Sequence, residues 1–452
     1  MKPALCTALL VALCAASAAR ASDDMDDVLG GFEEEDPAFE VETPETEEEP
    51  RFWDLSGSLE LSGSVNFLRH DSDTGTDYTG LQRLRQRMNL QLDLDLSERW
   101  QARIEGWAFY DFAYRINGRQ RYTDRVLREY EHDAEVGELW LQGKLLDWLD
   151  VKAGRQVVIW GRSESLRVLD VLNPLDNREP GRVDIEDLRR PVSMLRLDAY
   201  WGDWSLTGIA IPEIRFDANP VNGSDFFPSP PPGSPVPSER KPRSFVDPEF
   251  AAALTGIFSG WDVSLHGAWF WNDTPRLRRV VPSARTVHDR LWLVGAGGNL
   301  TLGSWLFKSE LAYLDGLGFF ATNDKNRIDA LAGLEYYGFT DTTLSVEVAV
   351  RHLLRYERVL RDAPDSTRET SEQIAVRLTR NFLREKLTLT LLALIFEVSA
   401  RDGAVLRADV DYEVFEAVSV GLGVILYEAG TLPPVDGWQH NDRVIFSAKW
   451  SF

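Results

Sequence analysis

The feature that most constrains the fold is a series of segments in which apolar and polar residues alternate with a period of two. In the clearest case, at 84–96, Met88 and the leucines after it occupy every second position, and Asn89, Gln91 and aspartates lie between them. A period of two is that of a β-strand, whose successive side chains point to opposite faces. One face of each strand therefore requires an apolar environment, and the other requires water.

About eighteen such strands, give or take two, are predicted from Phe52 onward. Dividing residues 51–452 among them leaves about 22 residues for each strand and its connection, which suits a membrane-spanning strand. The connections alternate between short ones, such as 97–99, 202–203 and 303–304, and long ones. The predicted fold is an all-β, transmembrane, antiparallel up-and-down β-barrel of about 16–18 strands with short periplasmic turns and long extracellular loops. The predicted strands are 55–69, 82–96, 100–114, 134–145, 149–160, 192–201, 204–212, 250–259, 261–272, 290–302, 305–314, 327–338, 343–356, 372–382, 387–398, 404–414, 418–428 and 443–452.

Tryptophans give an independent indication of a membrane. Trp100, Trp148, Trp204, Trp261 and Trp305 each lie beside a short connection. Tryptophans at one level along many strands are typical of an interfacial girdle, because the ring is apolar and its N–H group requires water.

The last strand resembles the C-terminal signal of outer-membrane proteins. Val444, Phe446, Ala448 and Trp450 alternate on one face, and the sequence ends at Phe452. This resemblance implies that Trp450 and Phe452 are recognised by the barrel-assembly machinery.

The N-terminal region predicts export. Residues 1–21 have a basic start, an apolar stretch and a small-x-small end, as a signal peptide does. Both cysteines, Cys6 and Cys14, lie within this segment. The apolar stretch is too short to span a bilayer. The mature chain is therefore predicted to lie in the cell outer membrane, in contact with its lipid.

Residues 22–50 hold fourteen acidic residues and no Lys or Arg. Such a segment cannot bury enough apolar surface to fold alone, so it is predicted to be a disordered periplasmic leader before the barrel domain at 51–452. Two interpretations are compatible with it: a solvated leader, or a short linear motif within 23–40 that binds a periplasmic or inner-membrane transport partner. The formal net charge of −23 excludes nucleic acid as the main partner.

A barrel of this size is too wide for side chains to fill, so a water-filled lumen is expected. On inward faces, basic residues cluster on two neighbouring strands and acidic residues on a distant one, which predicts opposed rings of charge across a pore. The alternative is that these groups are only solvated lumen residues. The candidate pore-lining residues are Arg83, Arg85, Arg87, Arg103, Glu105, Arg407, Asp409 and Asp411.

The connection at 161–191 is too long and too patterned to be a simple link. Ser163 is predicted to cap a short helix that ends at Val171, followed by a turn at Asn173–Asp176. Folded into the lumen, this segment would form a charged constriction; exposed outside, it would be an ordinary surface loop. The candidate constriction residues are Arg162, Arg167, Asp170, Asn173, Asp176, Arg178 and Arg182.

The segment Gly154-Arg155-Gln156-Val157-Val158-Ile159-Trp160-Gly161, followed by Asn173-Pro174-Leu175-Asp176, resembles the signature of an uncharacterised family of exported, porin-like bacterial outer-membrane proteins. The resemblance implies an outer-membrane barrel that handles hydrophobic or amphipathic compounds alongside inner-membrane export pumps. The motif residues are Gly154, Arg155, Gln156, Trp160 and Gly161. A strict count places Arg155 toward lipid, so we expect a β-bulge at Gly154 that turns it inward.

The sequence predicts no enzyme, no cofactor and no metal site. Its six histidines are scattered, and it contains neither an H-x-x-x-H pair nor a G-x-S-x-G motif. The predicted function is an outer-membrane channel for small solutes, linked to an export system. Two alternatives stay open: a non-conducting outer-membrane scaffold or adhesin, and a secreted soluble β-protein that binds glycans.

Overall fold

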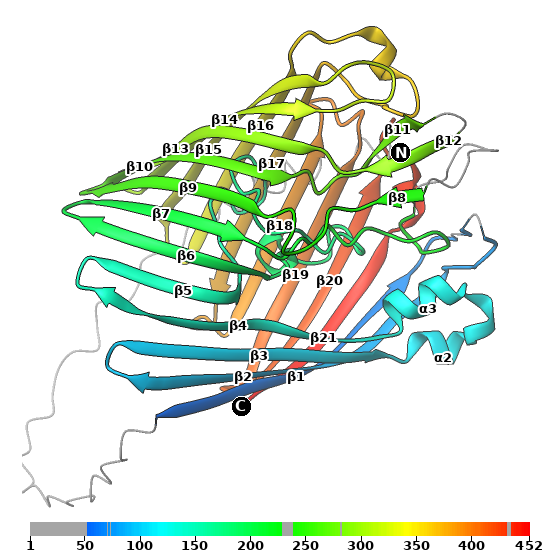
Figure 1. Ribbon diagram of the computed structural model, residues 1–452. Coiled ribbons are helices and arrows are strands. Elements are labelled where there is room, and N and C mark those ends of the chain that lie inside the picture. Colours follow the sequence, from blue (N-terminus) through cyan, green and yellow to red (C-terminus); the bar gives the residue numbers. More distant parts are fainter. Residues whose placement is uncertain (1–51, 70, 73, 228–237, 281–282, 432–434) are drawn as a thin grey trace, which may run out of the picture. The chain divides into compact units, whose positions relative to one another are not determined.

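The computed structural model describes residues 52–452 except 70, 73, 228–237, 281–282 and 432–434. The predicted signal peptide, the acidic leader and its partner-binding segment at 23–40 lie outside the described residues. The described chain forms an 18-stranded antiparallel sheet closed into a barrel, together with a separate 3-stranded sheet (Figure 1). The barrel strands are β1 (Trp53–Asn66), β2 (Gly80–Ser97), β3 (Trp100–Asp111), β4 (His132–Leu146), β5 (Leu149–Gln156), β6 (Val192–Trp201), β7 (Trp204–Ile211), β9 (Glu249–Phe258), β10 (Trp261–Trp271), β13 (Arg290–Leu302), β14 (Trp305–Leu317), β15 (Lys325–Phe339), β16 (Thr342–Leu353), β17 (Thr370–Phe382), β18 (Leu387–Phe396), β19 (Ala404–Phe415), β20 (Val418–Glu428) and β21 (Arg443–Ser451).

The remaining elements lie in the long connections. The small sheet consists of β8 (Ser238–Arg240), β11 (Arg276–Val280) and β12 (Ser283–Val287). The helices are α2 (Ala113–Asn117), η2 (Arg119–Arg121), α3 (Asp124–Tyr130), α4 (Ile185–Leu188), η3 (Arg358–Arg361) and η4 (Val435–His440). None of the helices in the described part of the chain is long and apolar enough to cross a membrane.

The first and last strands close the barrel. β1 pairs antiparallel with both β2 and β21, so no barrel strand is left with a free edge. At this seam Gly57 donates a backbone hydrogen bond of 2.8 Å to Phe452, and Phe452 donates one of 3.0 Å in return. The predicted fold class and strand number are therefore confirmed.

Each predicted strand is present, but five ends differ by three or four residues. The first strand ends at Asn66, not at 69, and β14 ends at Leu317, not at 314. The strand predicted to end at residue 114 ends at Asp111, where the chain turns into α2, and the one predicted to end at 356 ends at Leu353. The strand predicted to end at 160 ends at Gln156. Its last four residues, including Val158 and Trp160, continue the apolar run but pack in a buried cluster with other residues of the loop that follows.

The two faces of the barrel wall differ in exposure and polarity, as the alternate residues of β14 show. Phe307 and Leu311 are 43% and 54% exposed, whereas Lys308, Glu310 and Ala312, which alternate with them, are buried. Three of the five tryptophans beside short connections also follow this pattern, because Trp148, Trp261 and Trp305 are exposed. An apolar outer face is what lipid requires.

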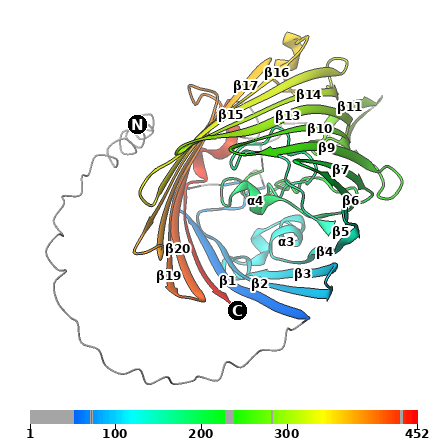
Figure 2. The ribbon, with the colours of Figure 1, turned by 90° about the vertical axis from the view of Figure 1, so that its left-hand side faces the viewer.

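Part of the inner wall is also apolar, which the sequence analysis did not predict. The largest core cluster combines residues after β5, among them Leu166 and Leu169, with inward residues of the wall, among them Phe270, Leu293 and Leu314. The main core of the chain therefore lies between the wall and the segment at 157–191, inside the barrel (Figure 2).

Candidate functional site: a loop across the lumen

The connection between β5 and β6, residues 157–191 and here called the lumen loop, is tied together at its two ends by Asn173. The Asn173 side chain is fully buried; it accepts a hydrogen bond of 2.8 Å from the Val158 N–H group and donates one of 3.0 Å to the carbonyl oxygen of Arg190. It also donates to the carbonyl oxygen of Gln156 at 3.3 Å. One side chain of the Asn-Pro-Leu-Asp turn therefore holds the start and the end of the loop at the wall.

Two carboxylates of the wall anchor the first half of the lumen loop. Glu310 on β14 accepts hydrogen bonds from the backbone N–H groups of Arg162, of Ser163 at 3.3 Å and of Leu169 at 2.9 Å. Glu347 on β16 accepts from the N–H groups of residues 164 and 165, at 3.2 and 3.3 Å. Hydrogen bonds to an ionised acceptor are stronger than neutral ones, so this segment is held firmly to the wall.

The predicted helix from Ser163 to Val171 is absent. Ser163 does behave as a cap, because its Oγ accepts from the Leu166 N–H group at 2.7 Å. The helix does not follow because nearby N–H groups, including that of Leu169, bind the wall carboxylates instead of carbonyl oxygens four residues earlier.

The sequence motif at residues 154–161 determines how the chain passes from β5 into the lumen loop. Gln156 is fully buried, Trp160 packs on His266 with ring centroids 4.7 Å apart, and a Cβ on Gly161 would lie 3.2 Å from the Cβ of Asp170. Asp170 in turn pairs with Arg189 at 2.9 Å, with both side chains buried. These contacts fold the loop back on itself directly after it leaves the wall.

The expected bulge at Gly154 is wrong. Pairing with β4 and β6 runs through Gly154 without a shift in register, so Arg155 stays opposite Leu139 and Ser193. Gly154 instead has a φ of 126°, and a Cβ there would lie 2.2 Å from the Leu139 carbonyl oxygen. The charge of Arg155 is neutralised without a bulge, because its guanidinium pairs with Glu213 at 2.9 Å and with Glu135 at 3.3 Å.

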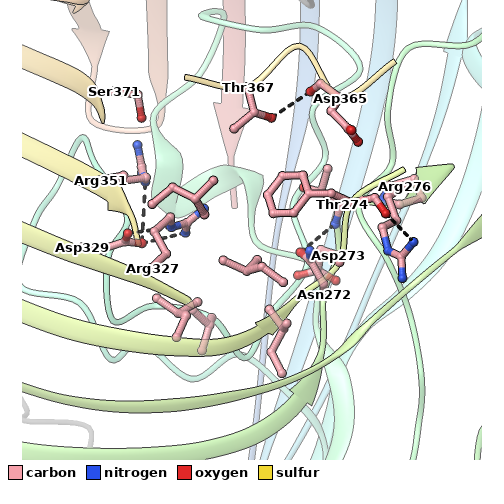
Figure 3. A pocket seen from close by; sticks show the side chains of 18 of the residues that line it. Asn272, Asp273, Thr274, Arg276, Arg327, Asp329, Arg351, Asp365, Thr367 and Ser371 are labelled. Carbon is pink, nitrogen blue, oxygen red and sulfur yellow. Dashed lines mark hydrogen bonds and ion pairs between the residues drawn. The ribbon is translucent and has the colours of Figure 1, made fainter. Parts of the chain in front are cut away.

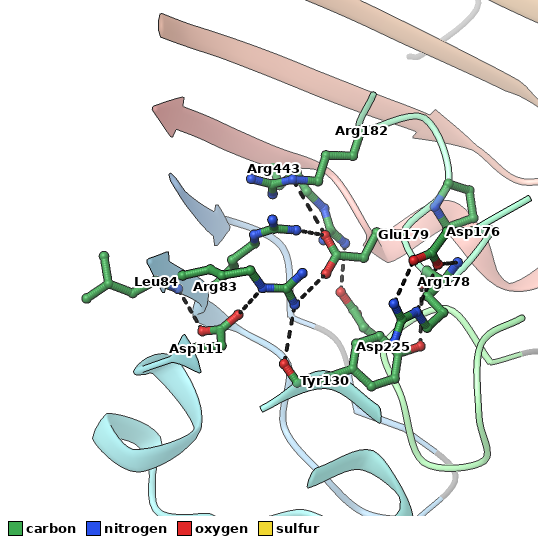
Figure 4. A network of polar contacts seen from close by, with 12 residues as sticks. Arg83, Leu84, Asp111, Tyr130, Asp176, Arg178, Glu179, Arg182, Asp225 and Arg443 are labelled. Atoms are coloured by element: carbon green, nitrogen blue, oxygen red, sulfur yellow. Dashed lines mark hydrogen bonds and ion pairs between the residues drawn. The ribbon is translucent and has the colours of Figure 1, made fainter. Parts of the chain in front are cut away.

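The second half of the loop places Glu179 within a group of arginines (Figure 4). Arg83 and Arg85 of β2 lie 2.6 and 3.4 Å from the Glu179 carboxylate, and Arg182 of the loop lies 3.5 Å from it. Arg85 also pairs with Asp111 at 3.3 Å. Two of the predicted pore-lining arginines therefore bind the lumen loop.

These contacts determine the charge state of Glu179. Burial alone would raise the pKa of its carboxyl group, but Arg83, Arg85 and Arg182 together hold that pKa well below its usual range. The carboxylate is therefore ionised at neutral pH and neutralises part of the arginine charge around it.

Further ion pairs and hydrogen bonds attach the lumen loop to the barrel wall and join its residues to one another. Arg162 pairs with Asp262 of β10 at 2.6 Å, and Arg407 of β19 pairs with Asp184 of the loop at 2.5 Å. Arg167 donates to carbonyl oxygens within the loop, and Asp176 pairs with Arg178 at 2.6 Å.

The predicted opposition of charge across a pore is wrong. Asp409 and Asp411 lie on β19, which is separated from β2 only by β20, β21 and β1, because closure of the barrel brings the last strands beside the first. Asp409 pairs with Arg407 at 2.6 Å, and Arg103 pairs with Asp93 at 2.7 Å. The acidic and basic candidates therefore share one sector of the wall.

Arg87, Glu105 and Asp411 differ from the other candidates, since no ion pair within the described residues joins them to a partner. The Arg87 guanidinium lies over the Trp107 ring, 4.7 Å from its centroid, and donates to Asn89. Glu105 lies beside Gly137, and Asp411 beside Gly421.

Sequence reasoning missed the anchors Glu310, Glu347, Asp262 and Glu179. A usable signal existed for Glu310, because it shares a face of β14 with Lys308 while Phe307 and Leu311 occupy the other face, so Glu310 had to point inward. Nothing in the local pattern identified its partner, more than a hundred residues away. Among the residues the structure describes, no three His, Cys, Asp or Glu side chains are grouped so that they could hold a metal ion.

The fold and the lumen loop define the class of this protein: a transmembrane β-barrel with a connection folded into its interior. The chain belongs to the family described as "Protein of unknown function (DUF1302)", whose model matches residues 2–395. No curated protein matches the chain.

The fold is similar to those of solved structures, among them OccAB1 and OccAB2. OccAB1 of Acinetobacter baumannii has a TM-score of 0.52 at 10% identity, and the match covers 90% of this chain and 99% of that one. OccAB2 of the same organism has a TM-score of 0.51 at 11% identity, covering 88% and 98%. At this level of identity the similarity extends to the fold alone.

Proposed function

We propose that the protein is an outer-membrane channel through which small solutes pass, and that the lumen loop is its constriction. The observation that carries this proposal is the attachment of one loop to widely separated strands. Arg162 binds Asp262 on β10, whereas Glu179 binds Arg83 on β2, and six barrel strands lie between these two by the shorter way round. A segment held at both places narrows the lumen that an eighteen-stranded barrel otherwise leaves open.

The fold shared with OccAB1 supports a barrel that sits in the outer membrane. The acidic segment at 23–40 is proposed to bind a periplasmic or inner-membrane transport partner, and Trp450 and Phe452 to engage the assembly machinery. The proposed activity is passage, and it assigns no catalytic role to any side chain.

The test is single-channel conductance of residues 22–452 in a planar bilayer, before and after deletion of Ser163–Arg189. Conductance steps that grow on deletion are expected. A matched control replaces the exposed tip Val398–Arg401 with glycines, because this tip bonds within its own turn and should leave conductance unchanged. Absence of current in both the full and the deleted protein would overturn the channel and favour the scaffold. Equal steps in both would remove the loop from the constriction.

Cell fractionation tests the location, and co-purification with and without residues 23–40 tests the partner. Recovery of the protein in the soluble fraction would contradict the location.

A further inference from the structure

A cavity of about 590 Å³ lies between the lumen loop and the long connections that follow β10, β14 and β16 (Figure 3). Its volume is within the range of sites that hold small organic ligands, about 300–1,000 Å³. Because long connections surround it, it faces the rim opposite the short turns.

One side of this cavity is apolar. Phe270, Leu291, Leu314 and Leu353 of the wall and Val168 of the loop line it, and each is buried. The lumen of a porin is ordinarily polar. An apolar inner wall therefore provides a surface for the apolar body of a ligand.

The arginines that line the cavity are already paired. Arg327 makes two hydrogen bonds of 2.6 Å to Asp329, and Arg351 donates to Gln373 at 2.6 Å and to the Arg167 carbonyl oxygen at 2.9 Å. Arg276 and Arg368 pair with Asp289 and Asp402. Because these arginines already bind partners, an anion would gain little by binding to them.

Asp273 lies across the cavity from Arg327, Asp329 and Arg351, as Figure 3 shows. No hydrogen bond or ion pair from the described residues reaches its carboxyl group. Asp217, which lines the same cavity, accepts from the Leu175 N–H group at 2.7 Å and carries no ion pair within the described chain.

Burial and the neighbouring Asp217 carboxylate raise the pKa of Asp273. Asp273 is half-buried, and a carboxylate in that position without an ion-pair partner gains from a cation placed beside it. Arg167 also lines the cavity and acts on both carboxyl groups, but it pairs with Asp170 at 3.3 Å, so neither Asp273 nor Asp217 has an ion-pair partner of its own within the described residues.

We propose that this cavity binds an organic cation, with a primary ammonium group at Asp273 and Asp217 and an apolar body against Phe270 and Leu314. This inference rests on the proposed function and adds to it that the cavity is the outer vestibule of the channel. It assigns to that vestibule a preference for amphipathic amines over anions of the same shape.

The test is isothermal titration calorimetry of residues 22–452 in lipid nanodiscs with three probes of similar shape: phenethylammonium, phenethyl alcohol and phenylacetate. The wild-type protein is expected to bind the cation about tenfold or more tightly than the alcohol, because a hydrogen bond to a charged group contributes that much. Equal affinity for the cation and the alcohol, or preferred binding of phenylacetate, would overturn the proposal without any variant.

Two variants localise the effect. Asp273→Asn is expected to remove the preference for the cation, and Asp324→Asn, on the exposed connection after β14, to leave it intact. Heat-modifiable mobility checks that both barrels are folded. Preference retained in Asp273→Asn would overturn the assigned position. Conductance measurements separate the two proposals. If the protein conducts but shows no preference for the cation, only this inference is refuted. If it binds the cation but does not conduct, only the proposed channel is refuted.

Discussion

The Glu310 carboxylate on β14 accepts a hydrogen bond of 2.9 Å from the backbone N–H group of Leu169, and both residues are buried. This contact joins the wall to the backbone of the lumen loop, not to a particular loop side chain. The wall therefore determines the path of the loop, because the orientation of backbone N–H groups depends on that path.

Glu310→Gln should loosen the loop. The amide keeps the shape of the side chain but loses the charge that strengthens its hydrogen bonds to the N–H groups of Arg162, Ser163 and Leu169. We expect the attachment to weaken by about 1–3 kcal/mol. Single-channel recordings should show larger or more frequently fluctuating conductance. Ser309→Ala changes the exposed neighbour on the same strand and serves as the control. Identical traces from the two variants would show that Glu310 does not hold the loop.

Arg87→Gln should shift ion selectivity toward cations more than Arg85→Gln does. Arg85 is paired with Asp111 and Glu179, whereas Arg87 has a cation–π contact and a hydrogen bond to an amide. An unpaired charge contributes more to the field of a pore than a neutralised one. The reversal potential in a salt gradient measures the shift, and Arg99→Gln at an exposed short turn is the matched control. A larger shift for Arg85→Gln would contradict this assignment.

Acidification should release the second half of the loop only at low pH. The folded-state pKa of Glu179 lies below that of an unfolded Glu, about 4.3, so its ion pairs contribute full stability above that value. That stability is lost as the pH falls through the folded-state value. Conductance of the wild type should therefore stay constant from about pH 7 to pH 5 if Glu179 controls the loop. Glu179→Gln should show the released conductance already at neutral pH. A wild-type transition near pH 6 would assign control to another group.

The barrel could be predicted from the sequence because its determinants are local. Alternation along 84–96, turns such as Gly202-Asp203 and the tryptophans beside them each need only a few neighbouring residues. Lipid and water impose opposite demands on the two strand faces, and that contrast appears directly in the residue order.

The lumen loop could not be predicted in the same way, because its partners are distant in sequence. The bond from Ser163 to Glu310 spans 147 positions, and the one from Arg83 to Glu179 spans 96. The inner apolar wall was missed for a related reason: Leu291 and Leu293 point inward while Trp292 points outward, so the strand shows no alternation where the loop covers it. The alternation rule assumes a wet lumen, and it fails where the loop excludes water.

The seam of the barrel supports a last prediction, which concerns Phe452. Its backbone exchanges two hydrogen bonds with Gly57, and its ring covers that glycine so closely that a Cβ there would lie 2.7 Å from the ring. Two roles are compatible with this geometry: recognition by the assembly machinery, and packing at the closed seam.

Phe452→Ala separates the two roles, because alanine keeps the backbone bonds to Gly57 and removes only the ring. If the machinery recognises the ring, the folded fraction in cells should fall severalfold, whereas the purified variant should refold in detergent as the wild type does. If the ring acts by packing, both should fall, because Phe452 is 46% exposed and the seam covers the rest of it. Heat-modifiable gel mobility measures the folded fraction in both experiments, with Ser451→Ala as the control. A normal folded fraction in cells would remove Phe452 from the assembly signal.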